Sequence, residues 1–409
     1  MSLSFQCRSC AAPNGELVLD LGLQPLANNL LRPEDLGKPE PRIPLRLFVC
    51  PDCWLVQITD LVPPVDLFSE YLYFSSFSDA MLRHAAAAAQ RYVSEFGLGA
   101  ESLVVEVASN DGYLLQNFVR AGIPALGIEP AANIAQVARE KGIETLVEFF
   151  GAPLAERLAA ENRKADLILA NNVFAHVPDI NGFAEALRWL LKPNGTAILE
   201  FPYLLDLLEK TEFDTIYHEH VYYFSVTALE PLFKRHKLVI VRGEKLSIHG
   251  GSLRLFIQHE GRGQTGDSVA PLLKSEALAG ITSMRAYEGF SRKVAGIKKE
   301  LVDLITELRR KGNSVAAYGA SAKGSTLLNF AGLDSKRLDF VADRSTYKQG
   351  RFTPGTRIPI AGPSELLRRK PDYTLLLTWN FADEILEQQK EYRNAGGKFI
   401  LPVPEVRVV

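Results

Sequence analysis

The chain has 409 residues, of which 47% are hydrophobic and 23% charged, and its formal net charge is −2. These values are typical of globular proteins, and the length is enough for about two or three domains. The near-neutral charge argues against a protein that binds nucleic acid through phosphate neutralisation. The sequence has neither an apolar run long enough to span a membrane nor an apolar leader, so we expect a cytoplasmic protein with no membrane partner.

The cysteines form two C-x-x-C pairs, Cys7 with Cys10 in "CRSC" and Cys50 with Cys53 in "CPDC". Two residues between the thiols let both sulfurs turn toward one ion, and two such pairs complete the tetrahedral sulfur shell that zinc prefers. Four thiolates leave no open coordination position, so the metal would be structural. Two disulfides or a catalytic redox pair are the alternatives. A reducing cytoplasm disfavours the first, and two matched pairs fit the second poorly.

An alternation of helix and strand patterns follows this region. Residues 79–96 have apolar side chains spaced for one helix face, and residues 103–107 begin a strand–turn–helix–strand pattern. Further strands are predicted at 125–128 and within "DLILANNVFAHV" and "TAILEFPYL". Short continuous apolar runs of this kind are typical of buried parallel strands. The pattern therefore predicts a doubly wound α/β sheet.

The turn after the first predicted strand reads "EVASNDGYL" and contains a single glycine, Gly112. A turn with so little glycine argues against a pyrophosphate bound on the backbone, whereas Glu129 at the end of the second strand suits a ribose diol. These features fit a cofactor that has a ribose but no phosphates, such as S-adenosylmethionine. The run from Glu106 to Gly112 resembles the glycine-rich motif of class I methyltransferases, with Ala108 in place of a usual glycine. An ordinary turn of an α/β sheet is the alternative.

Two polar segments, "NNVFAHVPDI" and "TIYHEHVYYF", are expected at the carboxyl edge of this sheet, where doubly wound sheets bind ligands. His176 on the first segment and Tyr217, Glu219 and His220 on the second can then converge. A histidine can accept a proton at neutral pH, a glutamate can orient it, and further Tyr and His groups can donate to an oxyanion. This set suits removal of a proton beside a carbonyl, followed by attack of the enolate carbon on a methyl donor. The alternative for any single histidine is a structural, hydrogen-bonded role.

A second α/β unit follows a mostly helical stretch over residues 276–311. "SVAAYGASAKGSTLLNFAG" reads as a strand, a glycine turn and a helix, and the later strand patterns predict a second Rossmann-like sheet. Backbone donors and a lysine at the probable helix start predict an anion site, and basic residues on a following loop can add charge against a diphosphate. A solvated face is the alternative for this charge run. The predicted anion-binding residues are Ser321, Lys323, Arg344, Lys348 and Arg351.

Taken together, these motifs resemble the nucleotide-sugar C-methyltransferases, which methylate carbon 3 of a keto-deoxysugar in deoxysugar biosynthesis. The resemblance covers nearly the whole chain and rests on the C-x-x-C pairs and, in order, on "EYLYFSSFS", "EVASNDGYLL", "IYHEHVYYFS", "IHGGSLR", "YGASAKGSTLLN" and "KQGRFTPGTRIPI". It implies a small zinc-binding domain over residues 1–75, a class I S-adenosylmethionine-dependent methyltransferase domain with a Rossmann-like fold over 76–265, and a Rossmann-like nucleotide-sugar-binding domain over 266–409.

The resemblance also assigns roles to residues. His220 would be the general base, although Glu219 beside it stays open as the base. A tyrosine of "EYLYFSS" would reach the active site, with Tyr71 favoured over Tyr73. For His249 of "IHGGSLR", ligand contact and a plain hairpin turn both stay open. The implied catalytic set is His220, Glu219, Tyr217, His176 and Tyr71, and the implied methyl-donor set is Glu106, Ala108, Asn110, Gly112, Glu129 and Asn171.

The predicted function is therefore methylation of carbon 3 of a nucleotide-diphosphate keto-deoxysugar, with a dTDP sugar favoured. S-adenosylmethionine and zinc are the expected cofactors, and the nucleotide sugar is the expected small-molecule partner. An NAD(P)-dependent oxidoreductase of sugar nucleotides is the runner-up, with Asp343 as its ribose-binding acid. A non-catalytic zinc-bearing binding protein is the third class. The first turn lacks a pyrophosphate loop, which disfavours the oxidoreductase, and the titratable groups of residues 215–224 disfavour a purely structural protein.

Overall fold

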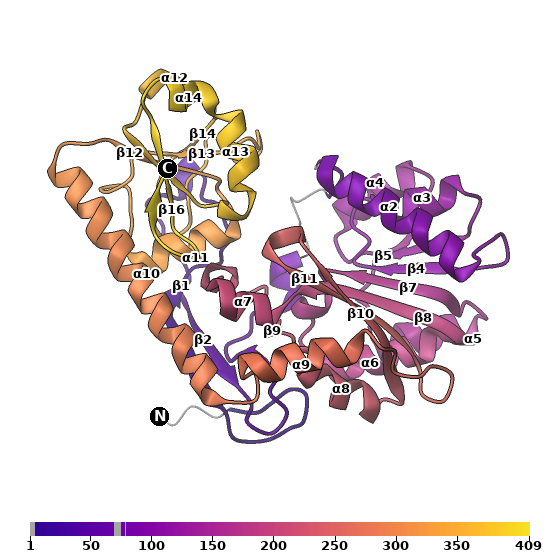
Figure 1. Ribbon diagram of the computed structural model, residues 1–409. Coiled ribbons are helices and arrows are strands. Elements are labelled where there is room, and N and C mark those ends of the chain that lie inside the picture. The colour runs from indigo at the N-terminus through magenta and orange to yellow at the C-terminus, as the bar shows by residue number, and fades with distance from the viewer. Residues whose placement is uncertain (1–4, 69–74, 78) are drawn as a thin grey trace.

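The computed structural model describes residues 5–68, 75–77 and 79–409 of the chain. Figure 1 shows two α/β lobes, a central lobe and a C-terminal lobe. The long helix α10 (Met284–Arg310) leads along one side of the molecule from the central lobe to the C-terminal lobe, next to the N-terminal strands. Tyr71 and Tyr73 lie outside the described residues, so the prediction that one of them reaches the active site stays a prediction.

The N-terminal sheet is antiparallel and has the strand order β1-β2-β3-β9. Its edge strand β9 does not come from the N-terminal region but begins two residues after "IYHEH". Val56 and Gln57 of β3 pair in register with Tyr223 and Tyr222 of β9. Main-chain pairing therefore ties the N-terminal domain to the polar segment of the central lobe. The strands are β1 (Glu16–Gln24), β2 (Ile43–Val49), β3 (Val56–Ile58) and β9 (Tyr222–Tyr223).

The central sheet has the order β10-β11-β8-β7-β4-β5-β6. Strands β4 to β8 run parallel, and β11 inserts antiparallel between β8 and β10. Its strands are β4 (Val104–Val107), β5 (Ala125–Ile128), β6 (Glu144–Leu146), β7 (Ala165–Asn171), β8 (Leu191–Pro202), β10 (Leu238–Leu246) and β11 (Ser252–His259). The predicted doubly wound sheet is confirmed, with an antiparallel hairpin added at one edge.

Helices cover both faces of the central sheet because both faces are apolar. Val104 and Leu167 pack with α2 and α3 on one face, whereas Val105 and Ile168 pack with α5, α6 and α8 on the other. Neighbouring strand residues point to opposite faces, so a sheet buried on both sides needs continuous apolar runs. The helices are α2 (Asp79–Phe96), α3 (Leu115–Arg120), α4 (Ala132–Glu140), α5 (Ala152–Ala160), α6 (Ile180–Leu190), α7 (Leu204–Lys210), α8 (Val226–Arg235) and α9 (Val269–Ala279).

The C-terminal lobe holds a second sheet in the order β14-β13-β12-β15-β16-β17, parallel except for β17. Its strands are β12 (Val315–Tyr318), β13 (Val341–Ala342), β14 (Ile360–Ala361), β15 (Tyr373–Leu376), β16 (Lys398–Leu401) and β17 (Arg407–Val408). Its helices after α10 are α11 (Ala322–Ala331), α12 (Ser364–Arg369), α13 (Ala382–Gln388) and α14 (Lys390–Asn394). The predicted second Rossmann-like unit is confirmed.

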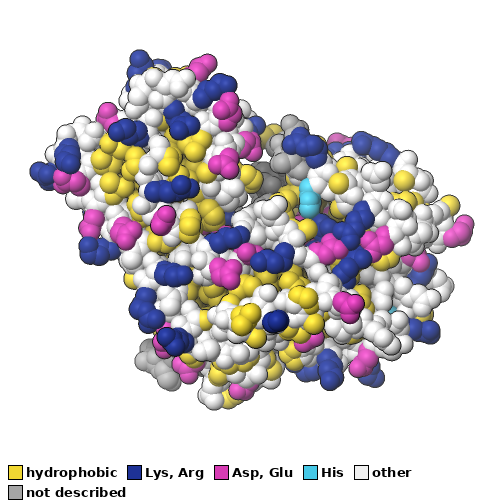
Figure 2. Space-filling view, in the orientation of Figure 1, with side chains coloured by type: hydrophobic (Ala, Val, Ile, Leu, Met, Phe, Trp, Pro, Cys, Tyr) yellow, Lys and Arg dark blue, Asp and Glu magenta, His cyan; other side chains and the backbone are white. Residues whose placement is uncertain are grey.

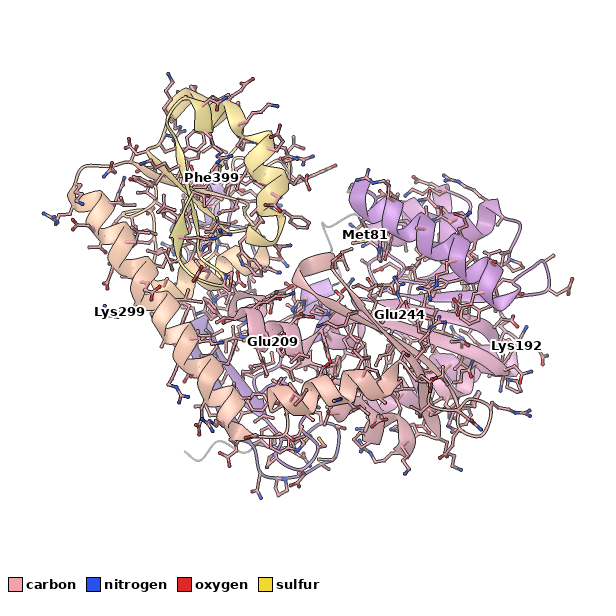
Figure 3. All side chains as sticks on the ribbon, in the orientation of Figure 1. Met81, Lys192, Glu209, Glu244, Lys299 and Phe399 are labelled. Atoms are coloured by element: carbon pink, nitrogen blue, oxygen red, sulfur yellow. The ribbon has the colours of Figure 1, made fainter. Side chains whose placement is uncertain are left out.

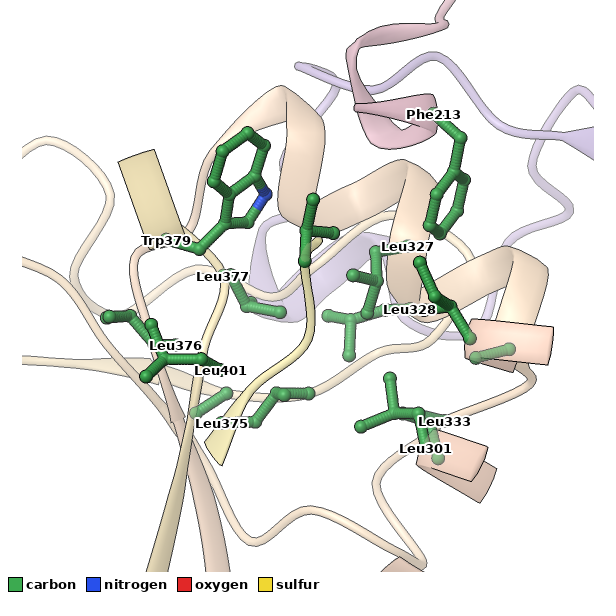
Figure 4. Close-up of a cluster of buried hydrophobic side chains, with 14 of the residues drawn as sticks. Phe213, Leu301, Leu327, Leu328, Leu333, Leu375, Leu376, Leu377, Trp379 and Leu401 are labelled. Carbon is green, nitrogen blue, oxygen red and sulfur yellow. The ribbon is translucent and has the colours of Figure 1, made fainter. Parts of the chain in front are cut away.

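The core of this lobe extends into its neighbours. Figure 4 shows Leu327 and Leu328 of α11 facing Leu375 of β15, with Leu301 of α10 below and Phe213 of the central lobe above. Burial of such side chains, at roughly 25 cal/mol per Å² of apolar surface, stabilises the contact between the lobes. Among the helices in the described part of the chain, none is both long and apolar enough to cross a membrane.

The loop "KQGRFTPGTRIPI" docks the C-terminal lobe onto the N-terminal domain. Leu31 and Phe352 exchange main-chain hydrogen bonds of 2.9 Å in both directions. The Glu40 carboxylate accepts a hydrogen bond from the main-chain N–H of Gly355 at 2.8 Å and lies 3.4 Å from the guanidinium of Arg357. The N-terminal domain is therefore bonded to both lobes.

A buried hydrogen bond links the C-terminal lobe to the start of the polar segment. The indole Nε1 of Trp379, in a short helical turn (Trp379–Phe381), donates to Oδ2 of Asp214 at 2.7 Å. Asp214 is fully buried in the turn Phe213–Thr215, and burial raises the pKa of its carboxyl, while Lys323 and Trp379 oppose that rise. Removal of the donor would leave a buried acceptor without its partner.

We expect Trp379→Phe to lower the free energy of unfolding by about 1–3 kcal/mol, because a buried acceptor loses its hydrogen bond. Trp189→Phe is the matched control, since its buried indole Nε1 has no hydrogen-bond partner among the described residues. Chemical denaturation of both variants measures the difference. Equal losses in the two variants would show that ring packing, and not the bond to Asp214, accounts for the effect.

Candidate active site

A cavity of about 470 Å³ lies at the carboxyl edge of the central sheet. Figure 2 shows the furrow between the two lobes on one face, where basic and acidic side chains are interspersed. Met81, near the start of α2, lines the cavity at the edge of the central lobe that faces the C-terminal lobe (Figure 3). The N-terminal domain contributes Asn28, and the C-terminal lobe contributes Lys323 and Lys348. The cavity is thus built by all parts of the chain.

The loop after β4 forms the floor of the central-lobe half of the cavity. Ala108 (φ 54°), Asn110 (φ 49°) and Gly112 (φ 75°) take left-handed backbone conformations, which produces a tight turn. The Glu129 carboxylate accepts hydrogen bonds from the main-chain N–H groups of Asn110 and Ala131, both at 2.9 Å. Burial raises the pKa of Glu129, and these two donors oppose that rise. Glu129 therefore both holds the loop and faces the cavity.

The structure separates the predicted methyl-donor residues into two groups. Ala108, Asn110, Glu129 and Asn171 line the cavity. Glu106, within β4, and Gly112, within the loop itself, are outside the lining. Glu106 is only 1% exposed, and burial raises its pKa well above the ordinary value, with further contributions from Glu129 and Asp111. A direct contact of Glu106 with the cofactor is therefore not supported by its position.

Sequence reasoning missed part of this half of the cavity. Glu148, Phe149 and Phe150 follow β6 and line it, together with Tyr113 and Met81. The available signal was their position after the third parallel strand, because strand ends meet at one edge of a doubly wound sheet. The lining combines apolar side chains with a carboxylate at the end of β5, and in the described residues its lysines come from the C-terminal lobe alone. This half fits a ribose-containing cofactor without phosphates, such as S-adenosylmethionine.

The polar segment brings the predicted catalytic side chains together. His220 Nδ1 lies 2.9 Å from the carbonyl oxygen of Thr215, which can only accept, so Nδ1 carries the hydrogen and Nε2 has the lone pair. The Tyr217 hydroxyl lies 2.8 Å from that Nε2 and donates to it. The ring centroids of His176 and His220 are 4.9 Å apart at 78°. The convergence of Tyr217, Glu219, His220 and His176 on one cavity is therefore observed.

The cavity changes the protonation of two of these groups in opposite directions. Desolvation lowers the pKa of His176 to about 4, although its hydrogen bonds to the main chain of Glu219 and Asn172 oppose the change. Desolvation raises the pKa of the Glu219 carboxyl to about 7, opposed by a hydrogen bond from Asn28. His176 is therefore neutral at physiological pH, and Glu219 titrates close to it.

The neighbouring His218 points the other way. It is 2% exposed, and its Nε2 lies 3.3 Å from the carbonyl oxygen of Pro44 on the N-terminal domain. Residues 217–220 form a turn, closed by a hydrogen bond of 2.9 Å from the His220 N–H to the Tyr217 carbonyl, and on this turn His218 faces the N-terminal domain while His220 lines the cavity. His218 therefore has the structural, hydrogen-bonded role that was the alternative for any single histidine.

The C-terminal half of the cavity contains part of the predicted anion site. Ser321, the N-cap of α11, accepts a hydrogen bond from the N–H of Gly324 at 3.1 Å and lines the cavity with Lys323 and Lys348. Arg344 instead lies 3.6 Å from Glu384 on the surface. Arg351 is also outside the lining, since its loop docks on the N-terminal domain. Thr378, Asn380 and Phe381 line this half and were missed by sequence reasoning.

The cysteine pairs meet as a zinc site would require. Their sulfurs lie within 4.8 Å of one another, with Cys7 and Cys53 3.5 Å apart and Cys10 and Cys50 3.6 Å apart. Zn–S bonds of about 2.3 Å place tetrahedral sulfurs about 3.8 Å apart, so the four donors fit zinc. All four thiols are free at these distances, so the structure gives no support to the alternative of two disulfides. Gln57 of β3 connects this site to the sheet, since it accepts from Arg8 N–H at 3.0 Å and donates to the Gln6 carbonyl at 2.9 Å.

Comparison with known families matches the chain in three parts. The families described as "Putative zinc binding domain", "Methyltransferase domain" and "C-methyltransferase C-terminal domain" match residues 7–68, 81–242 and 247–404. The C-methyltransferase NovU of Streptomyces niveus is 38% identical over 409 residues, which is 99% of this chain and 96% of that protein.

Two further matches cover only part of the chain. A ubiquinone biosynthesis O-methyltransferase of Chelativorans sp. (strain BNC1) is 33% identical over 93 residues, or 22% of this chain and 37% of that protein. A solved structure of magnesium protoporphyrin IX methyltransferase from Synechocystis PCC 6803 with bound SAM is similar with a TM-score of 0.35 and 15% identity, covering 46% of this chain and 86% of that one.

Gly112 allows a test of how tightly the loop after β4 is packed. A Cβ at Gly112 would meet Ile143 Cδ1 at 2.2 Å, and the residue has a φ of +75°. We therefore expect Gly112→Ala to lower the free energy of unfolding by about 2–5 kcal/mol and to weaken S-adenosylmethionine binding. Gly142→Ala is the control for backbone strain alone, with a φ of +80° and open space around the Cβ, and should cost about 1–2 kcal/mol. Denaturation and calorimetric titration measure both. Similar values for the two variants would refute the steric argument.

Loss of the metal should also affect β9, which lies in another part of the chain. Cys7→Ser should remove zinc and loosen the N-terminal sheet, and because β3 pairs with β9 it should also speed amide exchange at Tyr222 and Tyr223. Metal analysis and hydrogen exchange provide the two measurements. Asp52→Ala, an exposed change between two ligands, should retain the metal. Freshly purified protein without zinc would contradict the assignment.

Proposed function

This chain belongs to the S-adenosylmethionine-dependent C-methyltransferases, and we propose that it methylates carbon 3, beside the keto group, of a nucleotide-diphosphate deoxysugar, with a dTDP sugar favoured. One observation carries the proposal: the hydrogen-bonded pair of Tyr217 and His220 lines a cavity that has the loop after β4, with the carboxylate of Glu129, on one wall and two lysines on the other. A nucleotide sugar would span from the lysines to the histidine.

The two walls of the cavity suit different ligands, the methyl donor on one wall and the negatively charged diphosphate on the other. When bound, S-adenosylmethionine supplies an electrophilic methyl group, and Ala108, Asn110, Glu129 and Asn171 would hold it. On the opposite wall, Lys323 and Lys348 with the N-terminus of α11 would bind the diphosphate, since free N–H groups and ammonium groups both favour phosphate oxygens. Lys348 is held in position by its hydrogen bond to the Ala320 carbonyl at 2.8 Å.

His220 is the base in this proposal. Its Nε2 accepts the hydroxyl hydrogen of Tyr217 in this structure; once that hydroxyl turns to the substrate oxygen, the substrate proton would pass to Nε2 while the C–H electron pair enters the enolate. Nδ1–H keeps its bond to the Thr215 carbonyl in both protonation states, and that acceptor stabilises the imidazolium. The hydroxyl of Tyr217 would lose its acceptor at Nε2 in this step and could donate to the enolate oxygen instead.

His176 supports this step by staying neutral. A second imidazolium 4.9 Å away would disfavour protonation of His220 through like-charge repulsion. With the pKa of His176 lowered to about 4, no such charge is present at neutral pH. Alignment of the reacting groups in the cavity can contribute on the order of 7–11 kcal/mol to lowering the barrier.

The geometry does not favour an oxidoreductase. Asp343, the residue that would bind a nicotinamide ribose, uses Oδ2 to accept from the N–H of Ala320 at 2.7 Å and Oδ1 to accept from the N–H of Ser345 at 2.8 Å. It is 9% exposed and lies outside the cavity lining. Its role is to hold the turn that precedes α11.

We expect His220→Asn to lower turnover by roughly 10²–10⁴-fold with little change in stability, because the general base is lost. His218→Asn is the matched control, since that side chain faces the N-terminal domain, and it should retain most of the turnover. Mass spectrometry of nucleotide-linked keto sugars incubated with S-adenosylmethionine measures the gain of one CH2. Wild-type turnover in His220→Asn would refute the base assignment, and failure of every such sugar would refute the substrate class.

A further inference from the structure

The segment between Thr215 and Val221 is bonded to every domain. Thr326 of the C-terminal lobe donates its hydroxyl to the Ile216 carbonyl at 3.0 Å, and Val221 N–H donates to the Ala175 carbonyl of the central lobe at 2.8 Å. From the N-terminal domain, Ile58 N–H donates to the Val221 carbonyl at 3.0 Å. These bonds hold the backbone. A different contact from the N-terminal domain reaches a side chain that faces the cavity.

That contact joins Asn28 to Glu219, 191 residues apart in the sequence. Asn28 Nδ2 donates to Glu219 Oε1 at 2.7 Å, and both residues line the cavity. The turn that carries Asn28 is closed by hydrogen bonds of 3.1 Å from Asn29 N–H to Leu26 and 2.9 Å from Leu30 N–H to Asn28, and it leads directly into the bridge between Leu31 and Phe352. Asn28 is therefore held at a fixed place against the carboxylate.

We propose that Asn28 is a positioning residue that holds Glu219 ionised and aimed into the cavity, so that the zinc-binding domain takes part directly in the reaction. This inference rests on the proposed function. Ionised Glu219 would stabilise the imidazolium that forms on the adjacent His220 and accept a hydrogen bond from the substrate. Neither Asn28 nor its contact is suggested by any motif in the sequence.

The surroundings of Glu219 explain why one donor matters. The residue is 6% exposed, and desolvation raises the pKa of its carboxyl to about 7, where a small change in hydrogen bonding alters its charge. An N–H donor favours the charged form. The other charged or titratable groups that line the cavity are Tyr217 and His220 on its own segment, neutral His176, which bonds to its main chain, Lys323 and Lys348 on the opposite wall, and Tyr113, Glu129 and Glu148 in the cofactor half.

The direction in which Asn28→Ala shifts the pKa of Glu219 follows from this arrangement. Loss of the Asn28 amide removes a group that lowers the pKa of Glu219, so Asn28→Ala raises that pKa. The acidic limb of the kcat/KM profile should then move up by about one pH unit, because one hydrogen bond to a charged group corresponds to a shift of that order. Activity at pH 6 should fall by up to about tenfold, and activity above about pH 9.5 should be close to that of the wild type.

The experiment compares Asn28→Ala with Asn29→Ala, an exposed neighbour in the same turn for which the described structure has no side-chain hydrogen bond. Carboxyl titration of ¹³C-glutamate-labelled protein, with Glu219→Gln used to assign the resonance, reports the pKa without any assay of turnover. Asn28→Ala should raise it, and Asn29→Ala should leave it unchanged. In the Glu219→Gln background, Asn28→Ala should cause no further loss of activity, because both changes act on one contact.

Two results would overturn the inference: the same Glu219 titration in Asn28→Ala and wild type, or an equal loss of activity at every pH. A raised titration without methyl transfer to any nucleotide sugar would overturn the proposed function and leave the coupling between Asn28 and Glu219 supported. An unchanged titration with wild-type transfer would overturn the coupling alone.

Discussion

Main-chain pairing between β3 and β9 is the constraint on which the active site depends. β9 begins two residues after His220, and its partner β3 begins three residues after Cys53, one of the proposed zinc ligands. A polar segment such as residues 215–221 could not hold a fixed backbone by local propensity alone, since it has little regular structure of its own. The sheet supplies that backbone, and the metal supports the sheet. Metal binding and the geometry of the catalytic segment are therefore linked through a short stretch of chain.

Desolvation is the second organising effect, and the cavity responds to it differently at each group. His176 is kept neutral, whereas Glu219 titrates near pH 7 and accepts from Asn28. Glu129 faces the same cavity but accepts from two main-chain N–H groups, which favour its charged form. When a carboxyl is desolvated by burial, the hydrogen-bond donors that remain around it decide its charge. The protein thus obtains several protonation behaviours from similar residue types within one cavity.

The loop that contains Lys348 and Phe352 contributes to two tasks. Lys348 faces the cavity, and only four residues later Phe352 pairs with Leu31 of the N-terminal domain. The same loop therefore sets the position of the C-terminal lobe and supplies a cation to the wall that this lobe forms. The polar segment is likewise shared, since Thr326 and Trp379 of the C-terminal lobe bond to Ile216 and Asp214 around it. Contacts that dock the lobes are therefore also contacts that shape the cavity.

Local pattern alone determined the features that depend on short spacing. These are the cysteine pairs, the alternation of strands and helices, and the grouping of polar residues such as His176 and His220 after strands, because two-residue and strand-end periodicities are properties of neighbouring residues. Tertiary structure alone decided the pairing of β9, the contact of Asn28 with Glu219, the burial of Glu106 and the exclusion of Arg344 and Arg351 from the cavity. Each of these depends on which distant segments meet and on which side chains lose water when they do. Neither property is encoded in the spacing of residues along a single stretch of chain.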